Sequence, residues 1–184
     1  KVLVVGWDSA PPRLVFDVFR SEMPTLSALM ERGAWGRLAS TNPPITVPAW
    51  TAMMASKDPG QLGCYGFRNR KDHSYDAYAF ANGTHVKEPR LWDILGRSGK
   101  RSIVLGVPQT YPPRPIVGDM VTCFLTPSTK VAYTYPDTLK AEVEAASGGY
   151  VLDVDDEPLG PGGTELPGST VWVAPPVAAV VVVP

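Results

Sequence analysis

The apolar run near the start of the chain is the feature that most constrains its fold. Residues 2–5 are all apolar, and Gly6 ends the run. A short continuous apolar run is typical of a strand that is buried on both faces, as in parallel sheets covered by helices. Parallel neighbours need long crossover connections, which are usually helical. The start of the chain therefore predicts a strand of an α/β sheet.

The segments that follow alternate between helix and strand patterns. Helices are expected in four segments, residues 23–33, 47–56, 88–100 and 135–147. Strands are expected at residues 34–40 and 101–107. Such alternation is typical of a sheet with crossover connections. We therefore predict an α/β fold with a mainly parallel sheet that is flanked by helices.

Composition favours a globular protein that does not bind nucleic acid or membranes. The chain is 44% hydrophobic and 19% charged, and its formal net charge is -1. The longest apolar stretch, residues 171–184, is shorter than a membrane span and is broken by Pro175 and Pro176. Two cysteines are too few for a disulfide framework, and no signal peptide is recognisable. We therefore expect a cytoplasmic location.

Two residues suited to chemistry stand where predicted strands end. Asp8 follows the first strand, at the place where open parallel sheets form their ligand crevice. Thr46 follows the expected second strand and precedes a predicted helix. A carboxylate and a hydroxyl could together bind a divalent metal ion, which would lower the pKa of the hydroxyl. The helix N-terminus would favour a phosphate group there.

Each of these residues also has a purely structural explanation. An aspartate after a buried strand is often only a turn or cap residue. Threonine is among the preferred N-cap residues, and Thr46 stands immediately before a predicted helix. Pro48 would fit the first turn of that helix, where its missing N–H costs little. The residue pattern by itself leaves both explanations open.

Three stretches of the chain resemble a known family. They read KVLVVGWDSA, MPTLSALMERGAWGRLASTNPPITVPAWTAMMASKDPGQLGCYGF and VLGVPQTYPPRPIVGDMVTCFLTPS. Together they resemble the type I phosphodiesterase/nucleotide pyrophosphatase branch of the alkaline phosphatase superfamily. Within that branch they are similar to the predicted phosphohydrolase/phosphomutase group. The likeness runs from the first residue to about Asp156, so we expect only the N-terminal portion of the family's domain.

The resemblance implies an incomplete alkaline phosphatase-like fold and a metal-dependent hydrolase of small phosphoric esters. The family's first-strand aspartate is a metal ligand, and it falls on Asp8. The family's nucleophile opens the helix after the second motif and falls on Thr46, which would also contact metal. Thr51, one turn later, is expected to be a packing residue. The family's site holds two metal ions, commonly zinc, and forms a phosphorylated threonine.

Two departures narrow the expected specificity. Nucleotide pyrophosphatases usually carry an asparagine three residues after the nucleophile, and this chain has Ala49 there. Specificity for nucleotides is therefore not expected. Sulfatases need Cys or Ser at the nucleophile position and Arg four residues later, where this chain has Thr46 and Trp50. Sulfatase activity is excluded.

The family's remaining metal ligands are aspartates and histidines beyond the length of this chain. His73 and His85 do not have the family's spacing, and we expect both in surface loops. Residues 157–184 are rich in Pro, Gly and Val, and we predict an irregular tail after a domain of residues 1–156. Its abrupt change in composition favours a non-native continuation over a divergent genuine segment.

Two functional hypotheses follow. In the first, the chain is a fragment of a phosphoric ester hydrolase and is inactive by itself. In the second, it is a non-catalytic remnant or binding module that retains the first half of the fold.

Overall fold

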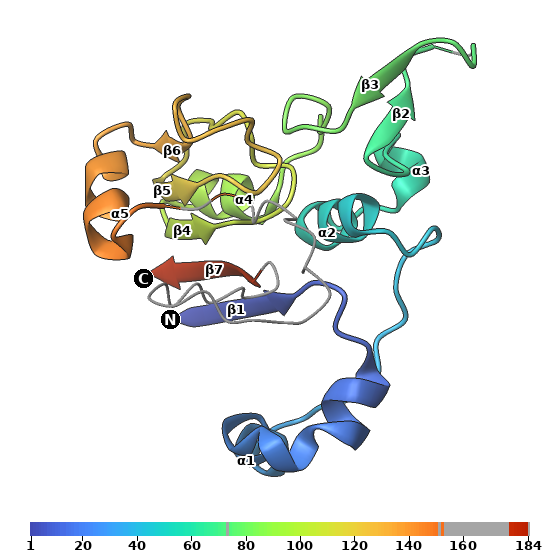
Figure 1. Ribbon diagram of the computed structural model, residues 1–184, viewed down its shortest axis with the longest axis vertical. Coiled ribbons are helices and arrows are strands. Elements are labelled where there is room, and N and C mark those ends of the chain that lie inside the picture. Colours follow the sequence, from blue (N-terminus) through green and yellow to red (C-terminus); the bar gives the residue numbers. More distant parts are fainter. Residues whose placement is uncertain (73, 151, 153–176, 184) are drawn as a thin grey trace, which may run out of the picture.

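A five-stranded mixed sheet forms the centre of the protein in the computed structural model, which describes residues 1–72, 74–150, 152 and 177–183 (Figure 1). The strand order is β1-β7-β4-β5-β6. The strands are β1 (Val2–Trp7), β4 (Arg101–Leu105), β5 (Gly118–Val121), β6 (Thr134–Tyr135) and β7 (Val177–Val183).

Three of these strands, β1, β4 and β5, run in the same direction. β4 pairs with β5 in parallel, whereas β7 is antiparallel to both β1 and β4, and β6 is antiparallel to β5. The predicted α/β class is therefore confirmed. The sheet is mixed rather than mainly parallel, because β4–β5 is the one parallel pair among the strand pairs that the structure describes.

Helices α2 (Thr46–Ala55) and α4 (Leu91–Arg97) contribute to the main core beside the sheet. The core consists of buried apolar side chains from both helices and from the β4–β5 region, namely Trp50, Met54, Trp92, Val104, Val107 and Met120. Val4 of β1 packs against this cluster. The predicted helices and the predicted strand in these segments are confirmed, with boundaries that differ by a few residues. None of the helices in the described ranges combines the length and hydropathy needed to cross a bilayer.

Strand β1 is not buried on both faces as predicted. It lies at one edge of the sheet, and the side chains of Leu3, Val5 and Trp7 are 63%, 59% and 46% exposed. Alternate residues of a strand point to opposite faces, so these three share one face. The core packs against the other face through Val4. The apolar run therefore places side chains on two faces of β1, of which one packs against the core and the other is exposed.

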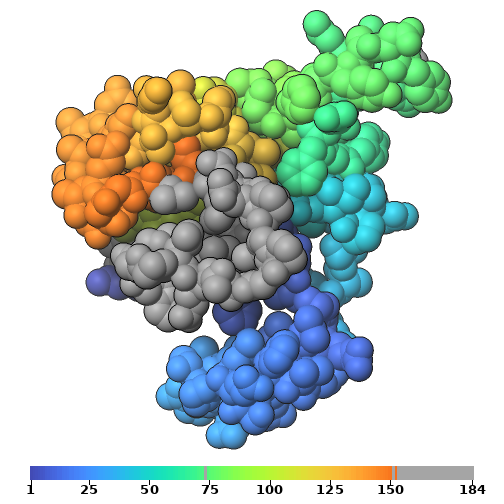
Figure 2. All heavy atoms as spheres, viewed as in Figure 1, coloured from blue at the N-terminus to red at the C-terminus, as the bar shows by residue number. Residues whose placement is uncertain are grey.

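The strand predicted at residues 34–40 does not form. Instead, the ring of Trp35 packs 5.1 Å from that of Phe16, and Arg37 pairs with Asp17 at 3.3 Å. These contacts tie the segment to a lobe that contains α1 (Pro24–Arg32) and the short turns Arg13–Val18 and Arg20–Glu22. Figure 2 shows this lobe, in blue, set apart from the body of the protein. The segment has partners in the lobe and none in the sheet ladders described.

A two-stranded antiparallel hairpin projects from the far side of α2 (Figure 1). It comprises β2 (Arg68–Arg70) and β3 (Tyr78–Phe80), and the short helix α3 (Pro59–Leu62) connects it to α2. His85 follows the hairpin in an exposed turn, where its Nδ1 accepts a hydrogen bond from the Asn82 N–H at 3.3 Å. The predicted surface position of His85 is confirmed, whereas His73 lies outside the described residues.

The predicted irregular tail is wrong for Val177–Val183, which form β7 in the middle of the sheet. Val182 pairs with Val2 on one side and with Ser102 on the other. β-branched residues favour strands, and this stretch finds hydrogen-bonding edges on both sides. The proposed boundary after Asp156 lies outside the described residues and stays a prediction.

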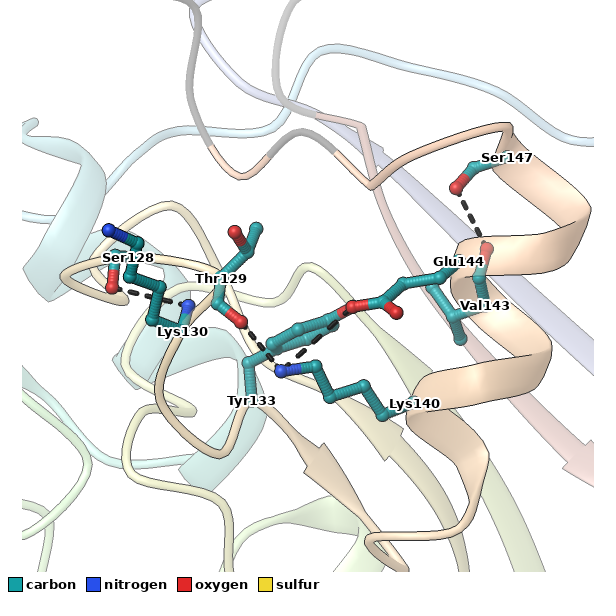
Figure 3. A network of polar contacts seen from close by, with 8 residues as sticks. All are labelled: Ser128, Thr129, Lys130, Tyr133, Lys140, Val143, Glu144 and Ser147. Carbon is teal, nitrogen blue, oxygen red and sulfur yellow. Dashed lines mark hydrogen bonds and ion pairs between the residues drawn. The ribbon is translucent and has the colours of Figure 1, made fainter.

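A polar network attaches helix α5 (Leu139–Ser147) to the loop before β6 (Figure 3). Lys140 donates to the Thr129 carbonyl at 2.6 Å, and its ammonium lies 5.0 Å from the ring centre of Tyr133. The Tyr133 hydroxyl donates to the Glu144 carboxylate at 3.2 Å. Tyr133 is fully buried and immediately precedes β6. Its contacts with Lys140 and Glu144 therefore hold α5 against that edge of the sheet.

Candidate active site

Asp8 and Thr46 come together at the C-terminal end of β1. β1 ends at Trp7, and Ser9 has a left-handed backbone conformation (φ 54°), so the chain turns immediately after Asp8. Thr46 is the first residue of α2, and its hydroxyl donates to Asp8 Oδ2 at 3.0 Å. Both residues are half-buried. The predicted proximity of the two side chains is confirmed, whereas their catalytic roles stay predictions.

Thr46 is not the N-cap of α2. The cap position belongs to Ile45, whose backbone is extended and whose carbonyl accepts the first helical hydrogen bond, from the Ala49 N–H at 3.0 Å. Thr46 lies one position inside the helix, so its hydroxyl is directed to Asp8 rather than to a helix amide. The capping explanation of Thr46 is therefore wrong, and its hydroxyl is held by a carboxylate.

Trp50 is the residue at the site that sequence reasoning missed. Its indole Nε1–H donates to Asp8 Oδ1 at 3.2 Å. Thr46 and Trp50 are four residues apart in one helix, so they lie on the same helix face. Both oxygens of the Asp8 carboxylate are therefore hydrogen-bonded from α2. The sequence signal that could have identified Trp50 is its position one helical turn after Thr46 in the same predicted helix.

A second, smaller core supports the start of α2. Val47 is fully buried and clusters with Cys64 and Ala81. Gln109, itself 1% exposed, donates from Nε2 to the Cys64 sulfur at 3.1 Å. Burial raises the pKa of the Cys64 thiol, so the sulfur stays a neutral acceptor. The first turn of α2 is thus packed against a hydrogen-bonded layer.

The buried guanidinium of Arg90 extends this layer. It donates to the Gln109 carbonyl at 2.8 Å and is only 4% exposed. Burial lowers the pKa of Arg90, because removal from water disfavours the charged form. Thr51 is also buried, and its hydroxyl donates to the Val47 carbonyl at 2.7 Å. Thr51 therefore has the surroundings of a packing residue.

The site combines a hydroxyl, a carboxylate and a helix N-terminus. The positive end of the α2 dipole lies where Thr46 begins the helix, and backbone N–H groups at such an end favour an anion. A hydroxyl that already donates its proton to a carboxylate is suited to act as a nucleophile. The arrangement can therefore bring an anionic electrophile to an oxygen nucleophile.

The same residues fit part of a divalent-metal site. Asp8 Oδ2 and Thr46 Oγ1 are oxygen donors 3.0 Å apart, and oxygen ligands suit hard and borderline cations. Catalytic zinc sites use about three protein ligands. In the part of the chain that the structure describes, no group of three or more His, Cys, Asp or Glu residues could hold a metal ion. The two oxygen ligands are of the right kind for a divalent metal ion, but they are fewer than a catalytic metal site needs.

The family model for type I phosphodiesterase / nucleotide pyrophosphatase matches residues 2–157. The chain belongs to this family. A type I phosphodiesterase is a hydrolase of the phosphodiesterase/pyrophosphatase type, and the family is generally metal-dependent and acts on small phosphate esters. The matched residues include Asp8, Thr46 and Trp50, whereas β7 lies beyond them. No curated protein and no solved structure matches the chain.

Proposed function

We propose that Thr46 is the nucleophile of a metal-dependent phosphoric ester hydrolase and that Asp8 is its partner and a metal ligand. The observation that carries the proposal is the 3.0 Å hydrogen bond from Thr46 to Asp8 at the N-terminus of α2. Family membership supplies the reaction class. The substrate is a small phosphate ester, and Ala49 in place of the pyrophosphatases' asparagine argues against a nucleotide.

In the proposed reaction, Thr46 Oγ1 attacks the phosphorus atom as its proton passes to Asp8. The bond from phosphorus to the ester oxygen breaks, and that oxygen leaves with the bonding electron pair. Asp8 passes that proton to the leaving oxygen. Water then attacks the phosphorus atom of phosphorylated Thr46 and gives a proton to Asp8, which returns it to Thr46 Oγ1 as the phosphate product leaves. Backbone N–H groups at the start of α2 would stabilise the negative charge on the phosphoryl oxygens. A bound divalent ion would lower the pKa of the hydroxyl and offset that charge.

We further propose that the complete site holds two zinc ions and that its other ligands lie downstream of the family match. The two donors at Asp8 and Thr46 support this, because they fall short of the usual ligand number. Cys64 and Cys123 are both free and buried, which supports a reducing compartment such as the cytoplasm.

The test is hydrolysis of an aryl phosphodiester with added zinc or manganese by a chain extended through the family's downstream region. Thr46→Ala should abolish turnover, and Thr46→Ser should retain part of it. Thr51→Val is the matched control, because it changes a buried threonine of the same helix without touching Asp8. Retained turnover in Thr46→Ala would overturn the proposal.

The alternative hypothesis, a non-catalytic remnant or binding module, predicts the opposite result for the same extended chain. It predicts no turnover and fewer than two metal ions per chain by elemental analysis. Acid-quenched protein provides a further readout, because the proposed reaction leaves a phosphoryl group on the peptide that contains Thr46. Absence of that adduct during turnover would exclude Thr46 as the nucleophile.

A further inference from the structure

We infer that Trp50 is a positioning residue that fixes the Asp8 carboxylate toward the Thr46 hydroxyl, and that Gly6 is required to seat its indole. The inference deepens the proposed function, because it names what orients the partner of the nucleophile. It stands on three observations about Trp50: its hydrogen bond, its burial and its contact with Gly6.

The first observation is a carboxylate held at both oxygens. Trp50 Nε1 lies 3.2 Å from Asp8 Oδ1, and Thr46 Oγ1 lies 3.0 Å from Oδ2. The terminal torsion of an aspartate side chain is broad, so one hydrogen bond leaves it free to turn. The second bond, from a rigid indole on the same helix, fixes the rotation of the carboxylate so that one oxygen faces Thr46.

The second observation is the burial of Trp50. Its side chain is 6% exposed and packs in the main core with Met54 and Val104. A buried indole N–H normally needs a partner. Trp92, a neighbour in the same core, has an Nε1 atom with no partner among the described residues. Trp50 has Asp8, so the orientation of the carboxylate is connected directly to the packing of the core.

The third observation explains why residue 6 is a glycine. A β-carbon at Gly6 would lie 2.8 Å from Cζ3 of Trp50 and would overlap Cη2. Gly6 is not among the residues with positive φ, so the backbone itself does not demand a glycine there. Gly6 and Asp8 are two residues apart, and the indole of Trp50 approaches both of them. The missing side chain leaves the space through which the indole reaches Asp8.

The hydrogen bond can be tested by NMR of the 184-residue chain labelled with ¹⁵N at its five tryptophans. Trp50→Phe identifies the Trp50 indole peak. Asp8→Ala should shift that peak more than any other indole peak and should speed exchange of its N–H with solvent. Asp8→Asn, which keeps an acceptor oxygen, should shift it less. Asp137→Ala, an exposed control, should leave it in place. A Trp50 peak that Asp8→Ala moves no further than Asp137→Ala does would overturn the inference.

The role of Gly6 in accommodating the Trp50 indole can be tested by thermal unfolding of variants. Gly6→Ala should lower Tm in the natural sequence, because the new methyl group displaces the indole. In the Trp50→Phe background the same substitution should cost little, because phenylalanine lacks the outer ring atoms that approach Gly6. An equal loss of Tm in both backgrounds would show that Gly6 does not act through Trp50.

Activity separates positioning from simple packing. In the extended chain, Trp50→Phe should lower kcat about tenfold to a hundredfold with little change in KM, the expected cost of a misoriented group. Met54→Leu, a core substitution of similar volume on the same helix, should leave kcat unchanged. Equal effects of the two variants on kcat would overturn the positioning role. If Thr46→Ala kept activity while the NMR results held, the proposed function would fail and the Trp50–Asp8 contact would stand.

Discussion

The side chains of Asp8 and Thr46 are 38 residues apart in the chain, and their oxygens are 3.0 Å apart. The lobe that contains α1 lies between them in sequence, so both of its ends return to the end of β1. Packing of α2 against β1 closes this loop. The candidate site therefore exists only in the folded protein.

The 184-residue chain should hydrolyse an aryl phosphodiester no faster than its Thr46→Ala variant. Asp8 and Thr46 supply two donor atoms, and electrostatic stabilisation of the phosphoryl group dominates phosphoryl transfer. The assay compares the two purified chains side by side with added zinc or manganese. Turnover by the natural chain and none by the variant would mean that these residues already contain a full metal site.

Gly118→Ala should destabilise the protein by more than about 2 kcal/mol. Gly118 has φ 133°, a conformation that side chains rarely adopt, and an added β-carbon would lie 2.8 Å from the carbonyl carbon of Ser102 on β4. Urea unfolding measures the loss. The control is Gly36→Ala, where an added β-carbon meets no atom within 4 Å. Similar midpoints for the two variants would contradict the prediction.

Lys140→Met should weaken the attachment of α5 and lower the free energy of unfolding by about 1 kcal/mol, the usual net contribution of a hydrogen bond. The substitution removes the bond to the Thr129 carbonyl and the cation above Tyr133 while keeping much of the side-chain volume (Figure 3). Amide hydrogen exchange should accelerate in α5 and in the loop before β6. Lys130→Met is the matched control, because Lys130 is exposed. Equal exchange in both variants would exclude a structural role for Lys140.

Stability should fall as the pH rises above about 8.5, the ordinary pKa of a thiol. Burial raises the pKa of the Cys64 thiol. Burial, and to a smaller extent the neighbouring Glu144 carboxylate, raises the pKa of the Tyr133 phenol. The folded state therefore keeps protons that the unfolded state releases, so the stabilisation is complete at lower pH and is lost through the alkaline range.

Urea midpoints at a series of pH values measure this effect. Cys64→Ala should flatten the lower part of the alkaline decline, and Tyr133→Phe should flatten the part above about pH 10, the ordinary pKa of tyrosine. A decline that persists unchanged in both variants would assign it to other groups.

Local rules predict a strand end at Asp8 and a helix start at Thr46, whereas the family resemblance indicated that the two residues share one site, because the strand expected before Thr46 does not form. An apolar run that ends in Gly-Trp-Asp places the aspartate at a strand end, and a proline-rich segment before an apolar helix places Thr46 at its start. Both positions hold in the structure. The indole of Trp50 could not be placed in the same way, because its partner depends on how α2 packs across Gly6.

The errors share a different cause, namely competition between distant partners. Residues 34–40 have an acceptable strand pattern, but Trp35 finds Phe16 in the α1 lobe. The valines of β7 looked irregular because their partners lie at the opposite end of the sequence. Propensity describes what a segment can form, and tertiary contacts decide what it does form.

The central place of β7 has a consequence for the protein during its synthesis. Val2 pairs with Val182, so the first strand cannot acquire this neighbour until Val182 has been made. At about 5 to 20 residues per second, the delay is on the order of 10 to 35 s. Throughout that interval β1 offers an apolar strand with unpaired edges, which other nascent chains can bind. Production of this protein should therefore depend on chaperones that shield β1 until β7 has been made.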